Sequence, residues 1–354
     1  MVTFITFQGK AAVDGGYFGG FISGSWQPIL FTIIFAACCF VIVYKGVEKG
    51  IEKVSKILMP ILAVLVIFIS IYSIFLKHTD AEGVTRTGLE GWAIYFKPNF
   101  EGLTFGGFLR TCLDAVGQLF YSLSIAMGIM IAYGSYMKKE ENLVKSVNKI
   151  EIFDTGIALL AGLMIIPAVF VFVGPEGLES AGPSLIFKIL PVVFDSMGGF
   201  GTFIGIIFFV TVFFAALTSA VSILEAITSS MMDKYGWSRK KATLVMAAAG
   251  FVVSVIVCLG YNVWEFSVTF ATVKEGQILD ILDYVSNNFL MPIIGILTCI
   301  LIGWVAKPKY VIDEVTANGE KFGRKNVFIV MIKFVTPVLL LFLLLSSFGL
   351  FEAK

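Results

Sequence analysis

Charge is scarce in this sequence of 354 residues, because Asp, Glu, Lys and Arg together make up 14% of it. Soluble domains carry about 25%. Hydrophobic residues reach 58% and the formal net charge is +1, so no basic surface for nucleic acid is expected. A chain with this balance is typical of a protein that lies in a membrane.

Residues that build most metal and catalytic centres are also rare. The one histidine, His78, lies in a polar stretch, which excludes a histidine metal site and a histidine proton relay. The cysteines lack zinc-site spacing and mostly lie in apolar runs, where they are expected to be small buried hydrophobes. They are Cys38, Cys39, Cys112, Cys258 and Cys299. With no phosphate loop, catalytic triad or paired catalytic carboxylates, we expect no enzyme and no cofactor.

Long apolar runs are abundant instead. Because about 20 apolar residues suffice to cross a bilayer as a helix, the recurring runs predict an all-α, polytopic membrane protein. We predict an external segment, 1–28, followed by one transmembrane domain, 29–350. Its eight expected spans are 29–45, 57–76, 108–137, 150–173, 200–232, 242–262, 278–306 and 326–350.

Lysine and arginine crowd alternate loops, those that follow the first, third, fifth and seventh spans. By the positive-inside rule these loops are cytoplasmic, so residue 1 starts outside. The first twenty residues do not form a secretory signal peptide. An external start without one leads us to expect an odd number of spans upstream of this sequence. The alternative is a complete eight-span protein with a short translocated tail.

The third span is interrupted at its middle, where it reads YSLSIAMG over residues 121–128. A break at mid-depth is tolerated only beside protein or a watery cavity, and interrupted spans mark binding sites in secondary transporters. We therefore predict unwinding between Ser122 and Gly128. The alternative is a continuous helix whose serine hydroxyls bond to their own backbone.

The fifth span carries Ala215, Thr218 and Ser219 at i, i+3 and i+4, so they share one helix face. Hydroxyl and carbonyl oxygens suit a small hard cation, and neutral ones suit a monovalent ion that must later leave. Packing between helices through small residues is the alternative.

Polar side chains in or at the ends of spans are functional candidates, because burial in lipid is costly. Solvated capping is the alternative for Asp233 and Asp283 and the expectation for Asp280. Interaction with the helix dipole at a helix start is a further alternative for Asp154 and Asp283. The candidates are Gln118, Asp154, Glu225, Asp233, Asp280 and Asp283.

Four stretches together resemble the bacterial branch of the neurotransmitter:sodium symporter family. They are VGQLFYSLSIAMG with YGSY (116–128, 133–136), FFAALTSAVSILEAITSSMMDKYGWSRKKA (213–242), YKGVEKGIEKVSKILMP (44–60) and ILDILDYVSNNFLMP (278–292). The resemblance covers about residues 16–350 and corresponds to the family's fourth to eleventh helices. The family's first three helices, with their Gly-Asn…Trp-Arg-Phe-Pro-Tyr motif, have no counterpart here.

The resemblance implies an incomplete leucine-transporter-like fold of inverted repeats, with the second repeat over about 108–306. It implies sodium ligands at Ser122, Asp154, Ala215 (carbonyl), Thr218 and Ser219. It implies substrate contacts at Tyr121, Ser122, Ser124, Met127, Ser219 and Ile223. It implies gating roles for Gln118, Tyr136, Asp233 and Asp283. Sodium is the only metal expected, and Asp154 is expected to replace chloride.

The function implied is sodium-coupled symport of a neutral, hydrophobic or aromatic amino acid by alternating access in a bacterial inner membrane. Ser122 and Asp154 are expected to approach each other on one side of the break, and Thr218 and Ser219 are expected to face it on the other. The alternatives are a truncated product that does not transport and a membrane subunit that pairs with a separate N-terminal chain. Glu225 and Asp154 also leave proton coupling open.

Overall fold

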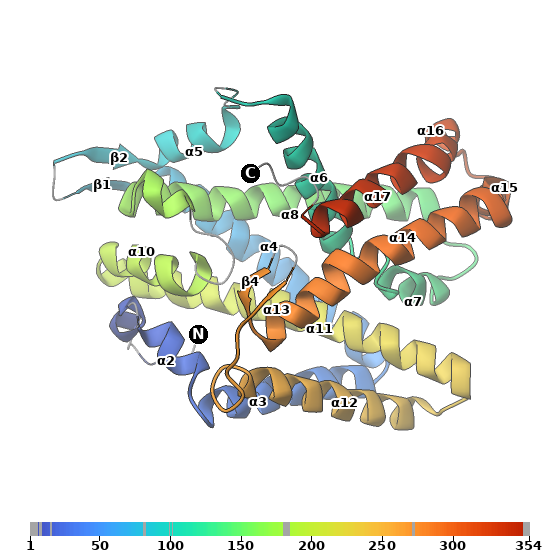
Figure 1. The fold of residues 1–354 in the computed structure, drawn as a ribbon, viewed down its shortest axis with the longest axis horizontal. Coiled ribbons are helices and arrows are strands. Elements are labelled where there is room, and N and C mark those ends of the chain that lie inside the picture. The colour runs from blue at the N-terminus through green and yellow to red at the C-terminus, as the bar shows by residue number, and fades with distance from the viewer. Residues whose placement is uncertain are drawn as a thin grey trace. The chain divides into compact units, whose positions relative to one another are not determined.

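The computed structural model describes residues 6, 9–14, 16–80, 83–98, 100, 102–179, 185–270 and 273–349. Parts of the predicted external segment 1–28, and the end of the last predicted span, lie outside these residues. Figure 1 shows the helices and strands of the chain in order. The chain divides into two compact units. The first is Met1–Phe100, Thr155–Leu224 and Thr243–Phe251, and the second is Glu101–Asp154, Glu225–Ala242 and Val252–Lys354.

Three long helices run from one unit into the other: α8 (Leu143–Phe172), α11 (Gly199–Tyr235) and α12 (Arg239–Leu259). The other elements of the first unit are η1 (Gly9–Val13), α2 (Tyr17–Ile22), α3 (Gln27–Tyr44), η2 (Val47–Glu52), α4 (Lys53–Ile74), β1 (Lys77–Thr79), β2 (Thr85–Thr87), α5 (Gly88–Phe96), η3 (Pro175–Glu179), η4 (Leu185–Ile189) and α10 (Leu190–Ser196).

The second unit contains one helix on each side of the predicted break and a C-terminal helical hairpin. Its elements are α6 (Phe105–Ser122), α7 (Ile129–Ser135), β3 (Val268–Phe270), β4 (Val273–Gly276), α13 (Ile278–Asp283), η5 (Tyr284–Leu290), α14 (Met291–Ile300), η6 (Leu301–Val305), α15 (Pro308–Val315), α16 (Lys325–Val330), η7 (Met331–Val335) and α17 (Thr336–Ser347). The segments η5, η6 and η7 are π-helical turns within longer helices.

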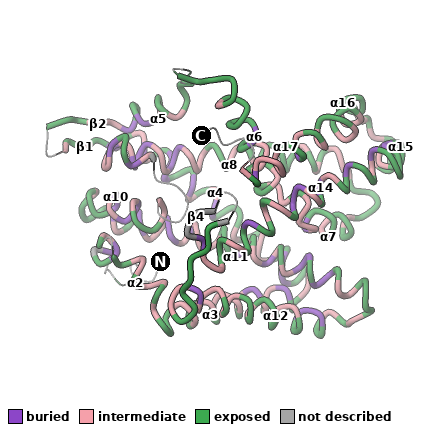
Figure 2. The backbone as a smooth tube through the Cα atoms, in the orientation of Figure 1, coloured by how far each residue is buried: buried purple, intermediate pink, exposed green. Residues whose placement is uncertain are grey.

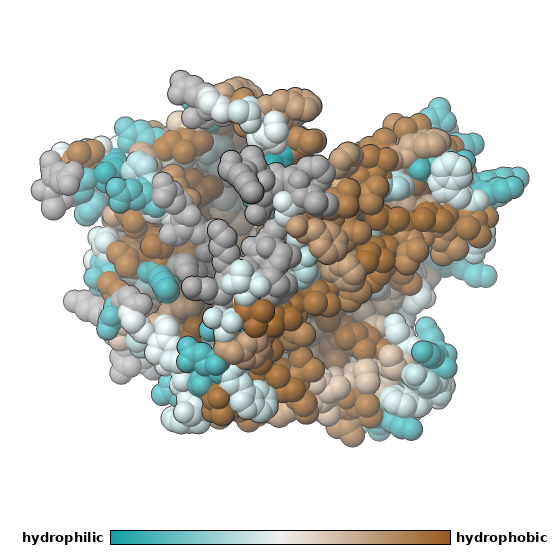
Figure 3. All heavy atoms as spheres, in the orientation of Figure 1, coloured by the Kyte–Doolittle hydropathy of each residue, from teal (hydrophilic) through white to brown (hydrophobic). Residues whose placement is uncertain are grey.

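Among the described residues, seven helices are long and apolar enough to cross a bilayer, as expected for a multi-pass membrane protein. They are Gln27–Tyr44, Val47–Ile74, Leu143–Phe172, Gly199–Tyr235, Arg239–Leu259, Ile278–Val305 and Lys325–Ser347. The predicted span 108–137 is not one of them, because it is divided into α6 and α7. Large apolar side chains are exposed along most of these helices. Exposed residues recur along each of them (Figure 2), and the visible surface of α14 and α17 is largely hydrophobic (Figure 3).

Serine hydroxyls join the helices inside the first unit. On α4, Ser70 Oγ lies 2.7 Å from Leu160 O and Ser73 Oγ lies 2.7 Å from Leu163 O, both on α8. Trp92 Nε1 of α5 donates to Ser73 Oγ at 3.0 Å. Small hydroxyl residues let helix backbones approach closely in a membrane and supply hydrogen bonds across the interface.

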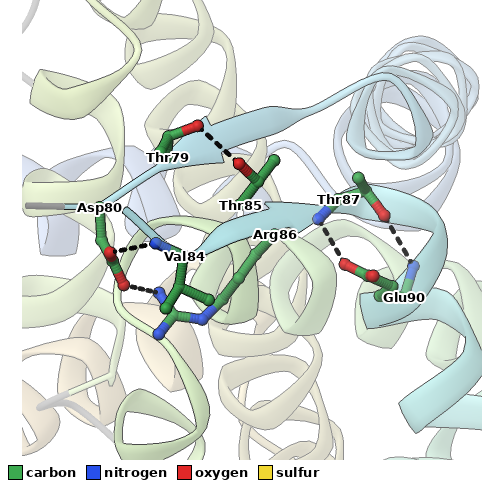
Figure 4. A network of polar contacts seen from close by, with 7 residues as sticks. All are labelled: Thr79, Asp80, Val84, Thr85, Arg86, Thr87 and Glu90. Carbon is green, nitrogen blue, oxygen red and sulfur yellow. Dashed lines mark hydrogen bonds and ion pairs between the residues drawn. The ribbon is translucent and has the colours of Figure 1, made fainter. Parts of the chain in front are cut away.

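Two short β-hairpins differ from the all-helical expectation, which the remaining elements follow. In the first, Asp80 accepts from Val84 N at 2.9 Å and pairs with Arg86 at 3.0 Å (Figure 4). Thr87 and Glu90 then form a capping box at the start of α5. Strands of three or four residues are too short to show the hydrophobic alternation by which a strand is recognised in a sequence.

Gly91 allows α5 to lie against the backbone of α8. A Cβ atom added at Gly91 would lie 2.5 Å from Pro167 Cα, and this backbone atom cannot rotate away. We expect Gly91→Ala to lower the free energy of unfolding by about 1–3 kcal/mol through overpacking. The melting temperature of the purified chain in detergent measures this loss.

The matched control is Gly156→Ala on α8, where no atom lies within 4 Å of the added Cβ. This control should be neutral, or stabilising by about 0.5–1 kcal/mol, since Ala favours a helix over Gly. Equal melting temperatures for the two variants would contradict the close approach of α5 and α8.

Candidate functional site

The third predicted span is broken where its hydroxyl residues lie. Helix α6 ends at Ser122 and α7 begins at Ile129, which confirms the predicted interruption. Within the break, Ser124, Ala126 and Gly128 have positive φ angles of 54°, 64° and 79°. Residues with a Cβ rarely adopt this conformation, so the packing of the surrounding chain must hold it in place.

The end of α6 brings a hydroxyl and a carboxylate together. Ser122 Oγ donates to Asp154 Oδ2 of α8 at 3.3 Å, and both residues belong to the second unit. Asp154 is half-buried. The carboxyl end of a helix carries partial negative charge on its unpaired carbonyls, so cations are favoured there.

The composition of this site favours a monovalent cation over a divalent one. No group of three or more His, Cys, Asp or Glu side chains that could hold a metal ion occurs in the part of the chain that the structure describes. One carboxylate beside neutral hydroxyl and carbonyl oxygens provides hard ligands with a single negative charge. A single carboxylate matches the charge of a monovalent cation, whereas magnesium and calcium sites usually carry more carboxylates.

The proposed substrate contacts on this span lie on both sides of the break. Tyr121, in the last turn of α6, is 55% exposed, and Ser124 lies in the break itself. Met127 packs against a small buried cluster formed by Ile129 and Ala132 of α7 and Ala226 of α11. A hydrophobic contact therefore holds Met127 in place just before α7.

The remaining proposed ligands lie on α11 and belong to the first unit. Thr218 Oγ1 lies 3.0 Å from Ala215 O, so a hydroxyl and a carbonyl oxygen meet on one helix face as the spacing predicted. Ser219 and Ile223 are exposed on the same helix. Thr218 Oγ1 also lies 3.0 Å from Phe214 O. Its hydroxyl group can therefore bond to the backbone of its own helix, as is common for Ser and Thr in membrane helices.

A buried ionic cluster lies beside α7. Glu225 of α11 is 0% exposed, Tyr136 OH donates to its Oε1 at 2.6 Å, and Arg239 of α12 forms an ion pair with its Oε2. Both carboxylate oxygens are thus satisfied, as a buried charge requires.

Arg239 was missed as a partner by the sequence analysis, which counted it only among the loop charges. The position of Glu225 could have indicated this partner, because an acid buried within a span usually pairs with a nearby cation. Arg239 is the arginine at the start of the next helix, α12.

The other predicted gate residues have simpler surroundings. Gln118 and Asp233 are exposed, and no hydrogen bond or ion pair to either is found among the described residues. Asp283 Oδ1 accepts from Asn287 Nδ2 at 2.7 Å.

Asp280 accepts from Gln277 N at 2.8 Å in a capping box, which confirms its expected capping role. Burial raises the pKa of Tyr261, and the negative charge of Asp280 adds to the rise.

Proteins with related sequences are described as transporters. The chain is 32% identical to an uncharacterized sodium-dependent transporter of Haemophilus influenzae over 324 residues, 91% of this chain and 66% of that protein. It is 32% identical to another from Bacillus subtilis over 343 residues, 95% of this chain and 70% of that protein. The chain thus spans about two thirds of the length of these relatives.

A solved structure shares the fold. The crystal structure of MhsT in complex with L-phenylalanine matches with a TM-score of 0.82 and 33% identity, over 98% of this chain and 75% of that chain. This match confirms the predicted leucine-transporter-like fold, and the relatives are transporters, not enzymes. A sequence model described as the sodium:neurotransmitter symporter family matches residues 23–354. The chain therefore belongs to the sodium:neurotransmitter symporter family.

Proposed function

We propose that this chain forms the fourth to eleventh helices of a sodium-coupled symporter that moves a neutral, hydrophobic or aromatic amino acid by alternating access. The observation that carries the proposal is the break between α6 and α7, with Ser122 in contact with Asp154 at its edge. The relatives named sodium-dependent transporters support sodium as the coupling ion. The phenylalanine complex of MhsT supports an amino-acid substrate.

The first sodium ion is assigned to Ser122 and Asp154, and the second to Ala215 O, Thr218 and Ser219. Each set offers hard oxygen ligands, and the pair at 3.3 Å in the first set is close enough to share one ion. The neutral second set binds weakly enough for its ion to leave. Sodium and substrate favour the same conformational states, so their binding is coupled by differential affinity.

Apolar and hydroxyl side chains are assigned to the substrate by the family resemblance. In the second unit, Tyr121 and Met127 provide apolar contacts and Ser124 provides a hydrogen-bonding group. In the first unit, Ile223 provides an apolar contact and Ser219 a hydrogen-bonding group. Met127 has an unbranched, flexible side chain that adapts to different apolar substrates. This set suits large neutral side chains and offers no charged group except Asp154.

The gate on the lysine-rich side is assigned to the cluster of Tyr136, Glu225 and Arg239. It fixes the end of α7 to the start of α12 through a buried carboxylate. Asp233, Gln118 and Asp283 are assigned to gates as well, with roles that follow from the family resemblance. Breaking a buried ion pair is costly, so such a cluster can hold one conformational state closed.

Sodium-driven uptake tests the proposal directly. The resemblance places the family's first three helices outside this chain, so they are supplied from the Bacillus subtilis relative in a chimaera. In proteoliposomes we expect radiolabelled phenylalanine uptake only with an inward sodium gradient. Ser122→Ala should lower the apparent sodium affinity about tenfold, since hydrogen bonds to charged groups are worth about 1.5–3 kcal/mol.

Ser135→Ala is the matched control, because Ser135 donates to Ala132 O of its own helix. It should leave sodium affinity unchanged. Competition by a panel of amino acids measures the substrate range. Uptake that ignores sodium, or a strong preference for glycine or a charged amino acid, contradicts the assignment.

Asp154 is expected to make transport independent of chloride. It is the one acid that contacts Ser122 among the described residues, and its negative charge balances the first sodium ion. We expect Asp154→Ser to make uptake by the chimaera depend on chloride, because a free anion must then replace the carboxylate. Uptake is measured with chloride and with gluconate as the only anion.

Asp313→Ser, which removes an exposed carboxylate from α15, should leave uptake chloride-independent. If Asp154→Ser transports equally well with either anion, Asp154 is only a helix residue and the assignment is wrong.

The buried cluster predicts a large stability effect. We expect Glu225→Gln to lower the free energy of unfolding by about 3–5 kcal/mol, because it removes the buried carboxylate charge that pairs with Arg239. The double variant Glu225→Gln with Arg239→Gln should lose less than the sum of the single losses. Thermal unfolding of the purified chain measures this coupling in a double-mutant cycle.

Arg324→Gln is the comparison, since Arg324 pairs with Glu151 at 2.8 Å on the surface, where both side chains are exposed. Such pairs contribute about 0–1 kcal/mol. Additive losses at Glu225 and Arg239 would show that the cluster does not act as one unit.

A further inference from the structure

A lysine lies within the last apolar span. Lys333 belongs to the π-helical turn η7, inside the candidate span Lys325–Ser347. Charged side chains in a span are costly and usually have a partner. Lys333 is therefore a candidate for a function that the transport sites do not use.

The protein gives this charge only a weak partner. Lys333 Nζ lies 5.5 Å from the centroid of the Trp304 ring, on the π-helical turn η6. The stem of Lys333 lies against Gly303, where an added Cβ would be 3.4 Å from Lys333 Cγ. No carboxylate forms an ion pair with Lys333 among the described residues. A cation–π contact at an exposed ring balances only part of the cost of the charge.

The position of Lys333 places its ammonium group near the membrane surface. It lies eight residues after Lys325, about 12 Å along the helix. In a helix the Cα–Cβ bonds tilt toward the N-terminus, and lysine extends its charge toward water, so the ammonium group points back toward the lysine-rich end. The positive-inside rule assigns that end to the cytoplasmic leaflet.

The surroundings of Lys333 combine this charge with exposed apolar surface. Trp304 is 55% exposed and ends its span, which is the typical interfacial position of tryptophan. Four more exposed apolar side chains flank this pair on the same two helices. Leu301 and Phe334 lie on the membrane side, and Val305 and Val330 lie toward the lysine-rich end. The visible surface of these helices is largely apolar (Figure 3). A surface with a cation at headgroup depth and the apolar side chains of Leu301 and Phe334 below it is complementary to a lipid with an anionic headgroup.

We propose that Lys333 and Trp304 form a binding site for an anionic phospholipid of the cytoplasmic leaflet. The Lys333 ammonium group pairs with the lipid phosphate, and the indole N–H of Trp304 is a second donor. No described residue accepts a hydrogen bond from this N–H group. The acyl chains cover Leu301 and Phe334 and the line where α14 packs against α17.

Lipid titration of the full 354-residue chain in a nonionic detergent tests the site. Native mass spectrometry gives the apparent affinity for phosphatidylglycerol and for phosphatidylcholine. We expect Lys333→Met to weaken phosphatidylglycerol binding about fivefold, the contribution of one lysine at a membrane surface, and to leave phosphatidylcholine unchanged. Lys333→Arg should keep the preference for phosphatidylglycerol.

Lys241→Met is the matched control, because Lys241 Nζ lies 4.6 Å from the centroid of the Trp237 ring but at the start of α12, outside the apolar stretch. It should keep the affinity of the unchanged chain. Trp304→Leu is the second variant and keeps the lysine. This variant should also weaken phosphatidylglycerol binding. If Lys333→Met fails to fold, the affinity of Trp304→Leu tests the lipid site in its place.

Two results would overturn the proposal. Equal losses for Lys333→Met and Lys241→Met, or no loss for the Lys333 and Trp304 variants, would show general charge attraction without a site. Competition by glycerol 3-phosphate as strong as that by the lipid would show a site for a soluble phosphate compound.

Discussion

Backbone hydrogen bonding in the absence of water is the constraint on which this structure depends. Each apolar segment must pair its own N–H and C=O groups, and a helix does so within the segment. Residues 123–128 interrupt the helix, with positive φ angles at Ser124 and Ala126 that an uninterrupted helix would not contain. The first three of them still pair their N–H groups with carbonyl oxygens of α6: Leu123 with Leu119, Ser124 with Tyr121 and Ile125 with Phe120. Ser122 and Asp154 lie at the edge of this interruption.

The same low dielectric governs the charged side chains. Glu225 is fully buried and has both oxygens occupied, one by Tyr136 and one by Arg239. Asp154 has a hydroxyl partner and remains half-buried, so it can still bind a cation. In this chain, a carboxylate whose two oxygens both have protein partners stabilises one conformation. A carboxylate with fewer protein partners can also contact an ion or a substrate.

Packing contributes through small residues at places where helices approach closely. Gly91 lies against the backbone at Pro167, and Ser70 and Ser73 bond to carbonyl oxygens of α8. Since lipid is as apolar as leucine, these close contacts and hydrogen bonds hold the helices of the first unit together, as the hydrophobic effect does in water. The π-helical turns η6 and η7 likewise meet at Gly303.

The sequence by itself determined the membrane class, seven of the eight spans and the position of the break, because length, apolarity and the hydroxyl residues of 121–128 are local properties of the chain. The spacing of Ala215 and Thr218 also followed from helix periodicity. Only the tertiary structure decided that Arg239 pairs with Glu225, that Lys333 meets Trp304, and that two loops form hairpins. These contacts join residues on different elements, and which elements meet depends on the packing of the whole unit, which no local pattern encodes.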